Sequence, residues 1–379
     1  MAKKLLSTDY RINSDSDKIV IKGFYRAEQI QLITDVTPET GGTIMYNFAD
    51  TTKGHKGVEF DAFTEETTIF LEFDMGAYSI DSTSQVQIIV DHPEMEIELI
   101  FDDRELDFKP LNGMTIGSIY EKPSTRTRVS FEVGISKLGG NALTLLSNDI
   151  QLGSSETIAD TAEVLSRYLD CITYRCFSHS DVVELAMNSS IPVINALSDM
   201  HHPCQAAADL MTIVEHLDKL DGHIAWVGDG NNVLHDLVLA SAIIGIDIKY
   251  ATPKGLEPDQ RIINLAKDIA KENGVQISQS NNPKEVVTGA SVVYTDVFVS
   301  MGEEHMKSKF DSFEGFQVNK ELASLADRNY IFMHCLPAER GREVTDEVME
   351  SKNSIVFDEA ENRMHAQNAV MVYLQRFYS

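Results

Sequence analysis

Hydroxyl and guanidinium side chains stand together at Ser124, Thr125, Arg126 and Thr127, a combination that could bind a phosphate group. The apolar residues before this run predict a β-strand, and the residues after it predict a helix. The free N–H groups and the positive dipole end of a helix N-terminus attract an anion, and a guanidinium can hold phosphate by two hydrogen bonds. A helix start with solvated arginines would fit the same residues, so this run alone leaves both interpretations open.

Further polar clusters stand where predicted strands end, which is where open α/β sheets bind ligands. His202 and Gln205 begin a predicted helix, where a histidine could donate to a carbonyl oxygen and a glutamine could hold an amide. The other clusters are Asp296 with Ser300-Met301-Gly302, His334-Cys335-Leu336-Pro337, and Glu361-Asn362-Arg363. Each cluster alone could be an ordinary loop or helix start, but together they predict a substrate site.

The run from Gly228 to Asn232 resembles a dinucleotide-binding loop and has to be weighed as one. A third glycine of that motif would fall at Val233, and the next strand ends at Lys254 without the carboxylate that binds ribose. An NAD site is therefore disfavoured, and no cofactor is expected. Asn232 would instead suit an amino acid that carries both charges.

Strands and helices alternate from about Gly113 onward, which predicts parallel sheets covered by helices on both faces. The predicted strands are Thr115–Tyr120, Ala142–Leu146, Cys171–Arg175, Pro192–Asn195, Ile224–Val227, Asp247–Ala251, Val292–Thr295 and Tyr330–His334. The predicted helices are Thr127–Lys137, Thr157–Tyr168, Pro203–His216, Asn232–Ile244, Asp259–Glu272 and Glu359–Phe377.

The N-terminal part differs, because short runs of β-branched and aromatic residues alternate there with turn-like clusters. We therefore expect an α/β fold of two doubly wound parallel-sheet domains, preceded by a small all-β domain. The expected bounds are 1–92 for the β module, 93–221 for the first α/β domain with helix 359–379 returning to it, and 222–358 for a second, Rossmann-like domain.

The formal net charge of −27 argues against binding to nucleic acid or to an anionic membrane, because both require a basic face. The four cysteines include no CxxC pair, and this spacing argues against a zinc knuckle. A reduced, cytoplasmic setting is expected. No apolar run approaches the length of a membrane span, and the first residues do not form a signal peptide. An anionic substrate would need a local cluster of arginines to overcome this charge.

Together the motifs resemble the aspartate/ornithine carbamoyltransferase family, from about Gly113 to the end of the chain. The run Ser124–Thr127 and the run His202–Gln205 are typical of the whole family. The triplet Ser300-Met301-Gly302 and the run His334–Pro337 mark its ornithine branch. The resemblance implies transfer of a carbamoyl group from carbamoyl phosphate to the δ-amine of L-ornithine, without a metal. It also implies a homotrimer whose subunits share active sites.

The resemblance assigns roles to individual positions. The implied carbamoyl phosphate ligands are Ser124, Thr125, Arg126, Thr127, Gln151, Arg175, His202, Gln205, Cys335, Leu336 and Arg363, with Gln151 arriving from a neighbouring subunit. The implied ornithine ligands are Asn232, Asp296, Ser300 and Met301. The implied catalytic residues are Arg126, Arg175, His202, Asp296 and Cys335.

Several alternatives remain at this stage. The acceptor could be putrescine or N-acetylornithine, or the α/β part could be a silent scaffold. The β module, residues 1–92, is foreign to the family and could bind a partner that the sequence does not identify. Glu94–Phe108 is short and acidic where the family has a long helix. Cys335 beside His334 could be a covalent nucleophile, although the motif favours a residue that positions substrate.

Overall fold

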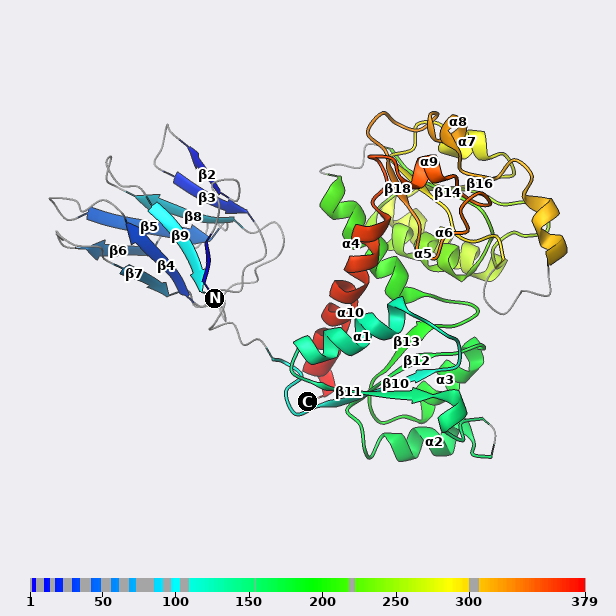
Figure 1. Ribbon diagram of the computed structural model, residues 1–379, viewed down its shortest axis with the longest axis horizontal. Helices are drawn as coiled ribbons and strands as arrows, with labels where there is room; N and C mark the ends of the chain where they lie inside the picture. Colours follow the sequence, from blue (N-terminus) through cyan, green and yellow to red (C-terminus); the bar gives the residue numbers. More distant parts are fainter. Residues whose placement is uncertain are drawn as a thin grey trace. The chain divides into compact units, whose positions relative to one another are not determined.

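The computed structural model describes the backbone of residues 109–153, 155–217, 222–299 and 307–378, together with strands between residues 2 and 102. The chain divides into two compact units, Met1–Phe108 and Lys109–Ser379 (Figure 1). Among the described residues, no helix is long and apolar enough to cross a membrane. The domain bounds expected from the sequence stay predictions.

The described strands of the first unit pair antiparallel in two sheets. One sheet has the order β1 (Ala2–Lys4), β9 (Ile97–Asp102), β4 (Gln29–Thr34) and β7 (Thr68–Glu72). The other has the order β2 (Tyr10–Asn13), β3 (Lys18–Lys22), β8 (Gln85–Val90), β5 (Gly42–Phe48) and β6 (Lys56–Phe60). The segments that join these strands lie outside the described residues, so the all-β module stays a prediction.

The second unit begins with a four-stranded parallel sheet. Its strand order is β11 (Asn141–Leu146), β10 (Thr115–Tyr120), β12 (Cys171–Arg175) and β13 (Val193–Leu197). Its helices are α1 (Arg126–Lys137), α2 (Ile158–Leu165), α3 (His179–Asn188) and α4 (Pro203–His216). Every residue of the central strand β12 is buried, as expected when helices cover both faces. The chain order reverses between β10 and β12, so the loops after these two strands form a crevice suited to a ligand.

The second parallel sheet has five strands. Its order is β16 (Ile277–Ser280), β15 (Ile248–Ala251), β14 (Ile224–Val227), β17 (Val292–Tyr294) and β18 (Ile331–Met333). Its helices are α5 (Asn232–Ile244), α6 (Gln260–Asn273), α7 (Pro283–Val287), α8 (Lys320–Ala323) and α9 (Asp346–Met349), with a 3-10 segment at Lys307–Phe313. The order reverses between β14 and β17. The prediction of two parallel-sheet α/β domains is confirmed.

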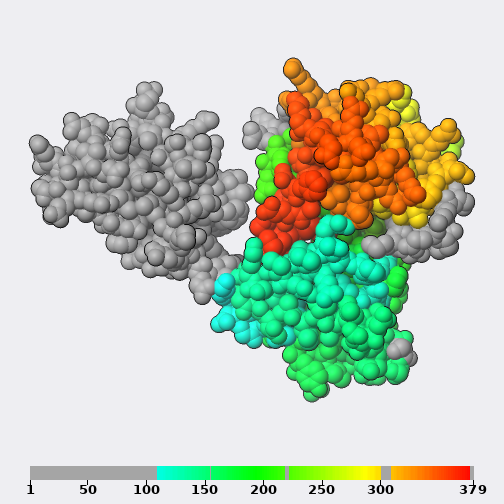
Figure 2. Space-filling view, viewed as in Figure 1, coloured from blue at the N-terminus to red at the C-terminus, as the bar shows by residue number. Residues whose placement is uncertain are grey.

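The last helix, α10 (Val356–Tyr378), begins beside the second sheet and packs against α4 and α1, two helices of the first sheet's domain (Figure 1). In Figure 2 the red atoms of α10 lie between the cyan and green first half of this unit and its orange second half. A buried polar contact joins α10 to α4, since Nδ2 of Asn362 donates to Oγ1 of Thr212 at 3.0 Å and to Oε2 of Glu215 at 2.6 Å. Residues at the start of α10 can therefore contribute to a site that both sheets share.

The loop between β14 and α5 is built around a close backbone approach at Gly230. A Cβ atom there would lie 2.3 Å from the nitrogen of Pro258 and 2.6 Å from the carbonyl oxygen of Leu256. The next residue, Asn231, caps α5, because its Oδ1 accepts the N–H groups of Val233 and Leu234. The glycine thus brings the loops after β14 and β15 together, which sets where α5 begins.

This close approach leads to a stability prediction. We expect Gly230→Ala to lower the free energy of unfolding by about 3 kcal/mol, because the obstructing atoms are backbone and cannot rotate away. Gly255→Ala is the control: its Cβ would meet nothing within 4 Å, and only its φ of +84° is unfavourable. That control should lose about 1 kcal/mol. Denaturant unfolding measures both, and equal losses would contradict the steric argument.

Candidate functional site

The N-terminus of α1 is where several predicted phosphate ligands meet. Oγ of Ser124 accepts the N–H of Thr127 at 3.2 Å, which ties the hydroxyl run to the first turn. Oγ1 of Thr127 in turn accepts from Nη1 of Arg175 at 3.4 Å and from Nη2 of Arg363 at 3.2 Å. Arg175 ends β12 and Arg363 lies in the second turn of α10. Three elements that are distant in sequence therefore converge on one hydroxyl group.

The guanidinium groups form a buried cationic cluster with Arg126 and His202. Burial, followed by the charge of Arg363, lowers the pKa of Arg175 to about 10. Burial and the same charge also lower the pKa of Arg126. The pKa of His202 lies well below its usual value, first because of burial and then because of the three arginines, so its imidazole is neutral. Positive charge is concentrated here despite the acidic composition of the chain.

Several N–H groups of this cluster still have capacity for a ligand. Nε of Arg175, Nε of Arg363 and Nδ1 of His202 are buried and have no hydrogen-bond partner among the described residues. Buried polar groups are costly without a partner. An anion with several acceptor oxygens, bound at the start of α1, would match both the charge and these donors.

Gln205 is held in a fixed orientation beside this cluster. Its Oε1 accepts from Nη1 of Arg363 at 2.6 Å, and its Nε2 donates to Oδ1 of Asp209 at 2.8 Å. The carboxamide therefore presents its oxygen toward the arginines. The second lone pair of that oxygen can accept from an amide N–H of a ligand.

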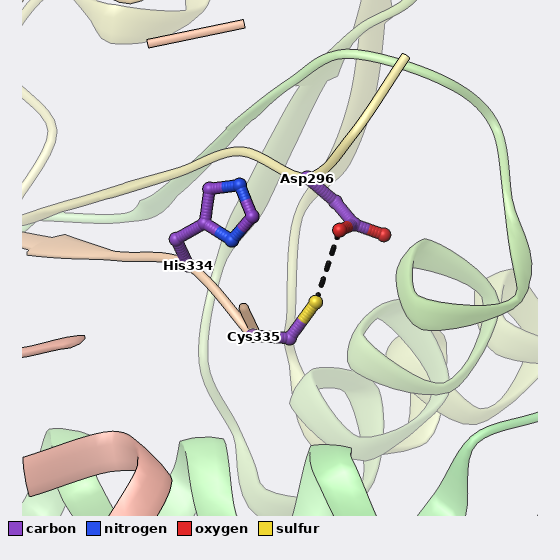
Figure 3. A group of neighbouring side chains, drawn as sticks. All are labelled: Asp296, His334 and Cys335. Carbon is purple, nitrogen blue, oxygen red and sulfur yellow. Dashed lines mark hydrogen bonds between the residues drawn. The ribbon is translucent and has the colours of Figure 1, made fainter. Parts of the chain in front are cut away.

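The second half of the site lies at the ends of β17 and β18. Oδ1 of Asp296 accepts from the thiol of Cys335 at 3.0 Å, the contact drawn in Figure 3. Oδ2 of the same carboxylate accepts from Nδ2 of Asn231 at 2.7 Å. Burial and the charge of Asp296 raise the pKa of Cys335 well above its usual value, so the thiol stays protonated. A protonated thiol is a poor nucleophile, which disfavours the covalent alternative.

The two halves face each other. The charge of Asp296 acts on Arg126, and those of Arg126 and Arg363 both act on Arg175. The anion side and the carboxylate side are therefore parts of one site between the two sheets.

The remaining predicted ligands are less closely tied to this site. Nδ2 of Asn232 donates to the backbone oxygen of Ser198 at 2.6 Å, which links α5 to the loop after β13. Leu336 has a φ of 54° and lies two residues after the buried His334. Thr125 is the N-cap residue of α1, and Gln151 is exposed on the loop before α2. Ser300 and Met301 lie outside the described residues, so their roles stay predictions.

Asp296, His334 and Cys335 could be mistaken for a metal site, because one ligand atom of each lies within 4.8 Å of the others (Figure 3). Nδ1 of His334 accepts the N–H of Leu336 at 2.9 Å, and Nε2 lies 3.2 Å from Oε1 of the buried Glu343. Neither ring nitrogen then has a free lone pair to offer, and the thiol is protonated. These residues fit a hydrogen-bonded group better than a metal centre.

Sequence reasoning missed three buried residues next to the site: Asp209, Tyr294 and Glu359. Glu359 accepts from Nε2 of Gln205 at 3.0 Å and from the N–H of His334 at 2.8 Å. The spacing of Asp209 four residues after Gln205 on one helix face could have drawn attention to it. Glu359 and Tyr294 gave no such signal, since an acidic residue and a strand tyrosine are each common in this chain.

An anion site at a helix N-terminus, shared by two doubly wound parallel sheets, defines a class of α/β enzyme that binds a phosphorylated substrate. The carbamoyl-P binding domain model of the aspartate/ornithine carbamoyltransferases matches residues 94–215, and the Asp/Orn binding domain model matches residues 221–374. The chain therefore belongs to the aspartate/ornithine carbamoyltransferase family.

Its relatives include enzymes named for ornithine. The ornithine carbamoyltransferase of Listeria innocua is 52% identical over 264 residues, covering 69% of this chain and 84% of the relative. The catabolic ornithine carbamoyltransferase of Thermoplasma acidophilum is 49% identical over 297 residues, covering 78% and 96%. The solved ornithine carbamoyltransferase of Pyrococcus furiosus is similar with a TM-score of 0.68 and 50% identity, covering 71% of this chain and 87% of that one.

The contact between Asp296 and Cys335 leads to a prediction about thiol reactivity. Cys335 is half-buried, whereas Cys171, Cys176 and Cys204 are buried. We expect slow alkylation of Cys335 by iodoacetamide at pH 8, because the raised pKa keeps it a thiol. In Asp296→Asn the neighbouring negative charge is removed, the pKa falls, and alkylation accelerates roughly tenfold for each unit of that fall.

Peptide mass spectrometry after timed labelling measures this rate for each cysteine. Asp268→Asn, which removes an exposed carboxylate on α6, is the matched control and should leave the rate unchanged. Equal alkylation rates of Cys335 in the unaltered protein and in Asp296→Asn would show that the Asp296 charge does not keep the thiol protonated.

Proposed function

We propose that this protein transfers the carbamoyl group of carbamoyl phosphate to the δ-amine of L-ornithine, which gives L-citrulline and phosphate. The observation that carries the proposal is the convergence of Arg126, Arg175 and Arg363 on the start of α1, facing the pair of Asp296 and Cys335. The cationic side suits the phosphate dianion, and the carboxylate side suits an ammonium group. The family and its ornithine-named relatives support the same assignment.

The phosphate side also explains how charge is handled during the reaction. Ser124, Thr125, Arg126 and Thr127 bind the phosphate at the positive end of α1. The neutral His202, with Arg126 and Arg175, donates to the carbonyl oxygen, where negative charge develops in the tetrahedral intermediate. Gln205 and Arg363 orient the carbamoyl amide, with Leu336 and Cys335 beside it and Gln151 supplied by a neighbouring subunit.

The amine side supplies the nucleophile. Asp296, held by Asn231 and Cys335, accepts a hydrogen bond from the δ-nitrogen of ornithine. The δ-ammonium releases one proton to solvent, and the neutral amine then attacks the carbamoyl carbon. A C–N bond then forms, the C–O bond to phosphate breaks, and phosphate leaves with the electron pair. The second proton on nitrogen can pass to the departing phosphate. Asn232, Ser300 and Met301 hold the α-amino acid end.

The same residues serve the reaction in either direction, because catalysis lowers one barrier for both. We infer that citrulline formation, as in arginine biosynthesis, is the direction to assay first. The named relatives include a catabolic enzyme from Thermoplasma acidophilum and an anabolic one from Campylobacter jejuni. A cytoplasmic setting is in keeping with four cysteines that are free among the described residues.

The substrate prediction is tested by supplying carbamoyl phosphate with ornithine, putrescine or N-acetylornithine in parallel. We expect carbamoylation of ornithine to exceed that of either alternative, because Asn232 and Asp296 provide for a free α-amino acid end and a δ-ammonium. In Arg126→Ala the rate should fall by at least about a hundredfold, since one charge-bearing donor is lost. Faster carbamoylation of putrescine would overturn the assignment, and no activity from folded protein would favour the silent scaffold.

We also propose that the protein is a homotrimer with shared active sites. An apolar surface lies at the edge of the first sheet: Val129 is 52% exposed and Val133 38% on α1, and Leu143 is 42% exposed and Leu146 38% on β11. β11 is an edge strand beside α1, and its side chains alternate between the two faces of the sheet, so Leu146 lies on the α1 face and Leu143 on the other. Exposed apolar side chains at a sheet edge and on the helix beside it suit a subunit interface.

The oligomer prediction has two parts. Leu143→Glu should convert trimers to monomers in light scattering, because a charge would be buried at the interface. Leu265→Glu, at an exposed position of α6, is the control and should leave the trimer intact. Mixing the subunits of inactive Arg126→Ala and Gln151→Ala proteins should restore part of the activity, because some sites then combine unaltered residues from two chains. Mixed subunits that stay inactive would mean that Gln151 does not serve a neighbouring site.

A further inference from the structure

We propose that Asp209, Tyr294 and Glu359 form a positioning hub that fixes the phosphate-binding and amine-binding halves of the site relative to each other. The three residues come from α4, β17 and the first turn of α10, and each side chain is fully buried. The inference rests on the proposed function, because it concerns how the groups of that reaction are placed. None of the three is assigned a contact with substrate.

The hydrogen bonds of the hub are continuous. Nε2 of Gln205 donates to Oδ1 of Asp209 at 2.8 Å and to Oε1 of Glu359 at 3.0 Å. The hydroxyl of Tyr294 lies 3.1 Å from Oδ2 of Asp209 and 3.0 Å from Oε1 of Glu359. Oε2 of Glu359 accepts the N–H of His334 at 2.8 Å. All four carboxyl oxygens are thereby engaged.

The count of hydrogens requires a proton on one carboxyl group. The Tyr294 hydroxyl has one hydrogen, so it can donate to only one of the two carboxyls, and it must accept at the other. Burial raises the pKa of Asp209 to about 7, and burial and the Asp209 charge raise that of Glu359 well above its usual value. Asp209 and Glu359 therefore share one proton, and the pair carries a single negative charge.

On the phosphate side, the hub sets which way the Gln205 carboxamide points. Both N–H bonds of Nε2 are used by Asp209 and Glu359, so Oε1 must face Arg363, 2.6 Å from its Nη1. A flipped carboxamide would direct N–H groups at a guanidinium and remove from both carboxyl groups the hydrogen bond that Gln205 donates. Arg363 in turn donates to Thr127 at the start of α1.

On the amine side, the hub holds the loop that carries Cys335. The bond from the N–H of His334 to Glu359 fixes the residue before Cys335, whose thiol donates to Asp296. An unbroken path of contacts therefore runs from Arg363 through Gln205 and Glu359 to this loop. A change in the hub should disturb both substrates, which a change confined to one half should not do.

A purely structural role has to be separated from positioning, and the chain offers a matched control. His216 of α4 joins the same two helices, because its Nε2 lies 3.0 Å from Oδ2 of Asp358 on α10. Its other ring nitrogen lies 3.0 Å from the backbone oxygen of Thr212. His216→Ala should therefore weaken the packing of these helices and lower the melting temperature without moving the KM for either substrate.

The experiment measures kcat, both KM values and the melting temperature of the full chain for Asp209→Asn, Glu359→Gln and His216→Ala. In Asp209→Asn an NH₂ group would face Gln205 or Tyr294, which both direct donors at this position. We expect both KM values to rise about tenfold, because a charged acceptor is lost. Glu359→Gln still accepts from the N–H of His334 and can donate to the hydroxyl of Tyr294, but it no longer accepts from Gln205, and we expect both KM values to rise about threefold. The two hub variants differ because Glu359→Gln keeps the bond to His334, whereas Asp209→Asn turns an NH₂ group toward Gln205 or Tyr294.

Calorimetric titration with inorganic phosphate gives a readout that does not depend on turnover. Asp209→Asn should weaken this binding about tenfold, while His216→Ala should leave it unchanged. An unaltered protein that binds phosphate but makes no citrulline would refute the proposed function and leave the hub testable by this titration. KM values and phosphate affinity within twofold of the unaltered protein in Asp209→Asn would overturn the hub. Equal shifts in His216→Ala would show that the three residues act through helix packing alone.

Discussion

The confinement of like charges is the constraint on which the rest of this structure depends. Burial lowers the pKa values of Arg126 and Arg175, and the nearby charge of Arg363 lowers both further. Such a cluster persists only where rigid elements hold it, because mutual repulsion would separate flexible side chains. A helix start, a strand end and a long terminal helix provide that rigidity. In a chain with a formal net charge of −27, they also create a local field opposite to that of the surface.

The topology of both sheets serves this confinement. Each sheet reverses its chain order once, between β10 and β12 and between β14 and β17. Loops from opposite sides of a reversal diverge and leave room for a ligand. The anion ligands follow one reversal, and Asp296 follows the other. The two crevices meet because α10 begins at the second sheet and ends on the first.

Much of this could be predicted from the residues, and the failures have physical causes. Apolar strands such as β12 and β14 were predicted with their observed bounds, since buried parallel strands are continuous apolar runs. The edge strand β16 was missed, because Ile277 is followed by three polar residues that its exposed position tolerates. At the site, motif residues were found, but Glu359 was not. Its burial depends on packing between helices that are far apart in sequence.

The capping role of Asn231 has a consequence for anyone who sets out to change the acceptor specificity of this protein. The Asn231 side chain accepts N–H groups at the start of α5 and also donates to Asp296. When variants at Asn231 are selected for a new amine, a loss of activity could come from poor folding or from altered chemistry. The effect of a substitution there would therefore depend on which other substitutions stabilise α5. Substitutions intended to change the acceptor are better placed on loops whose side chains do not also cap a helix.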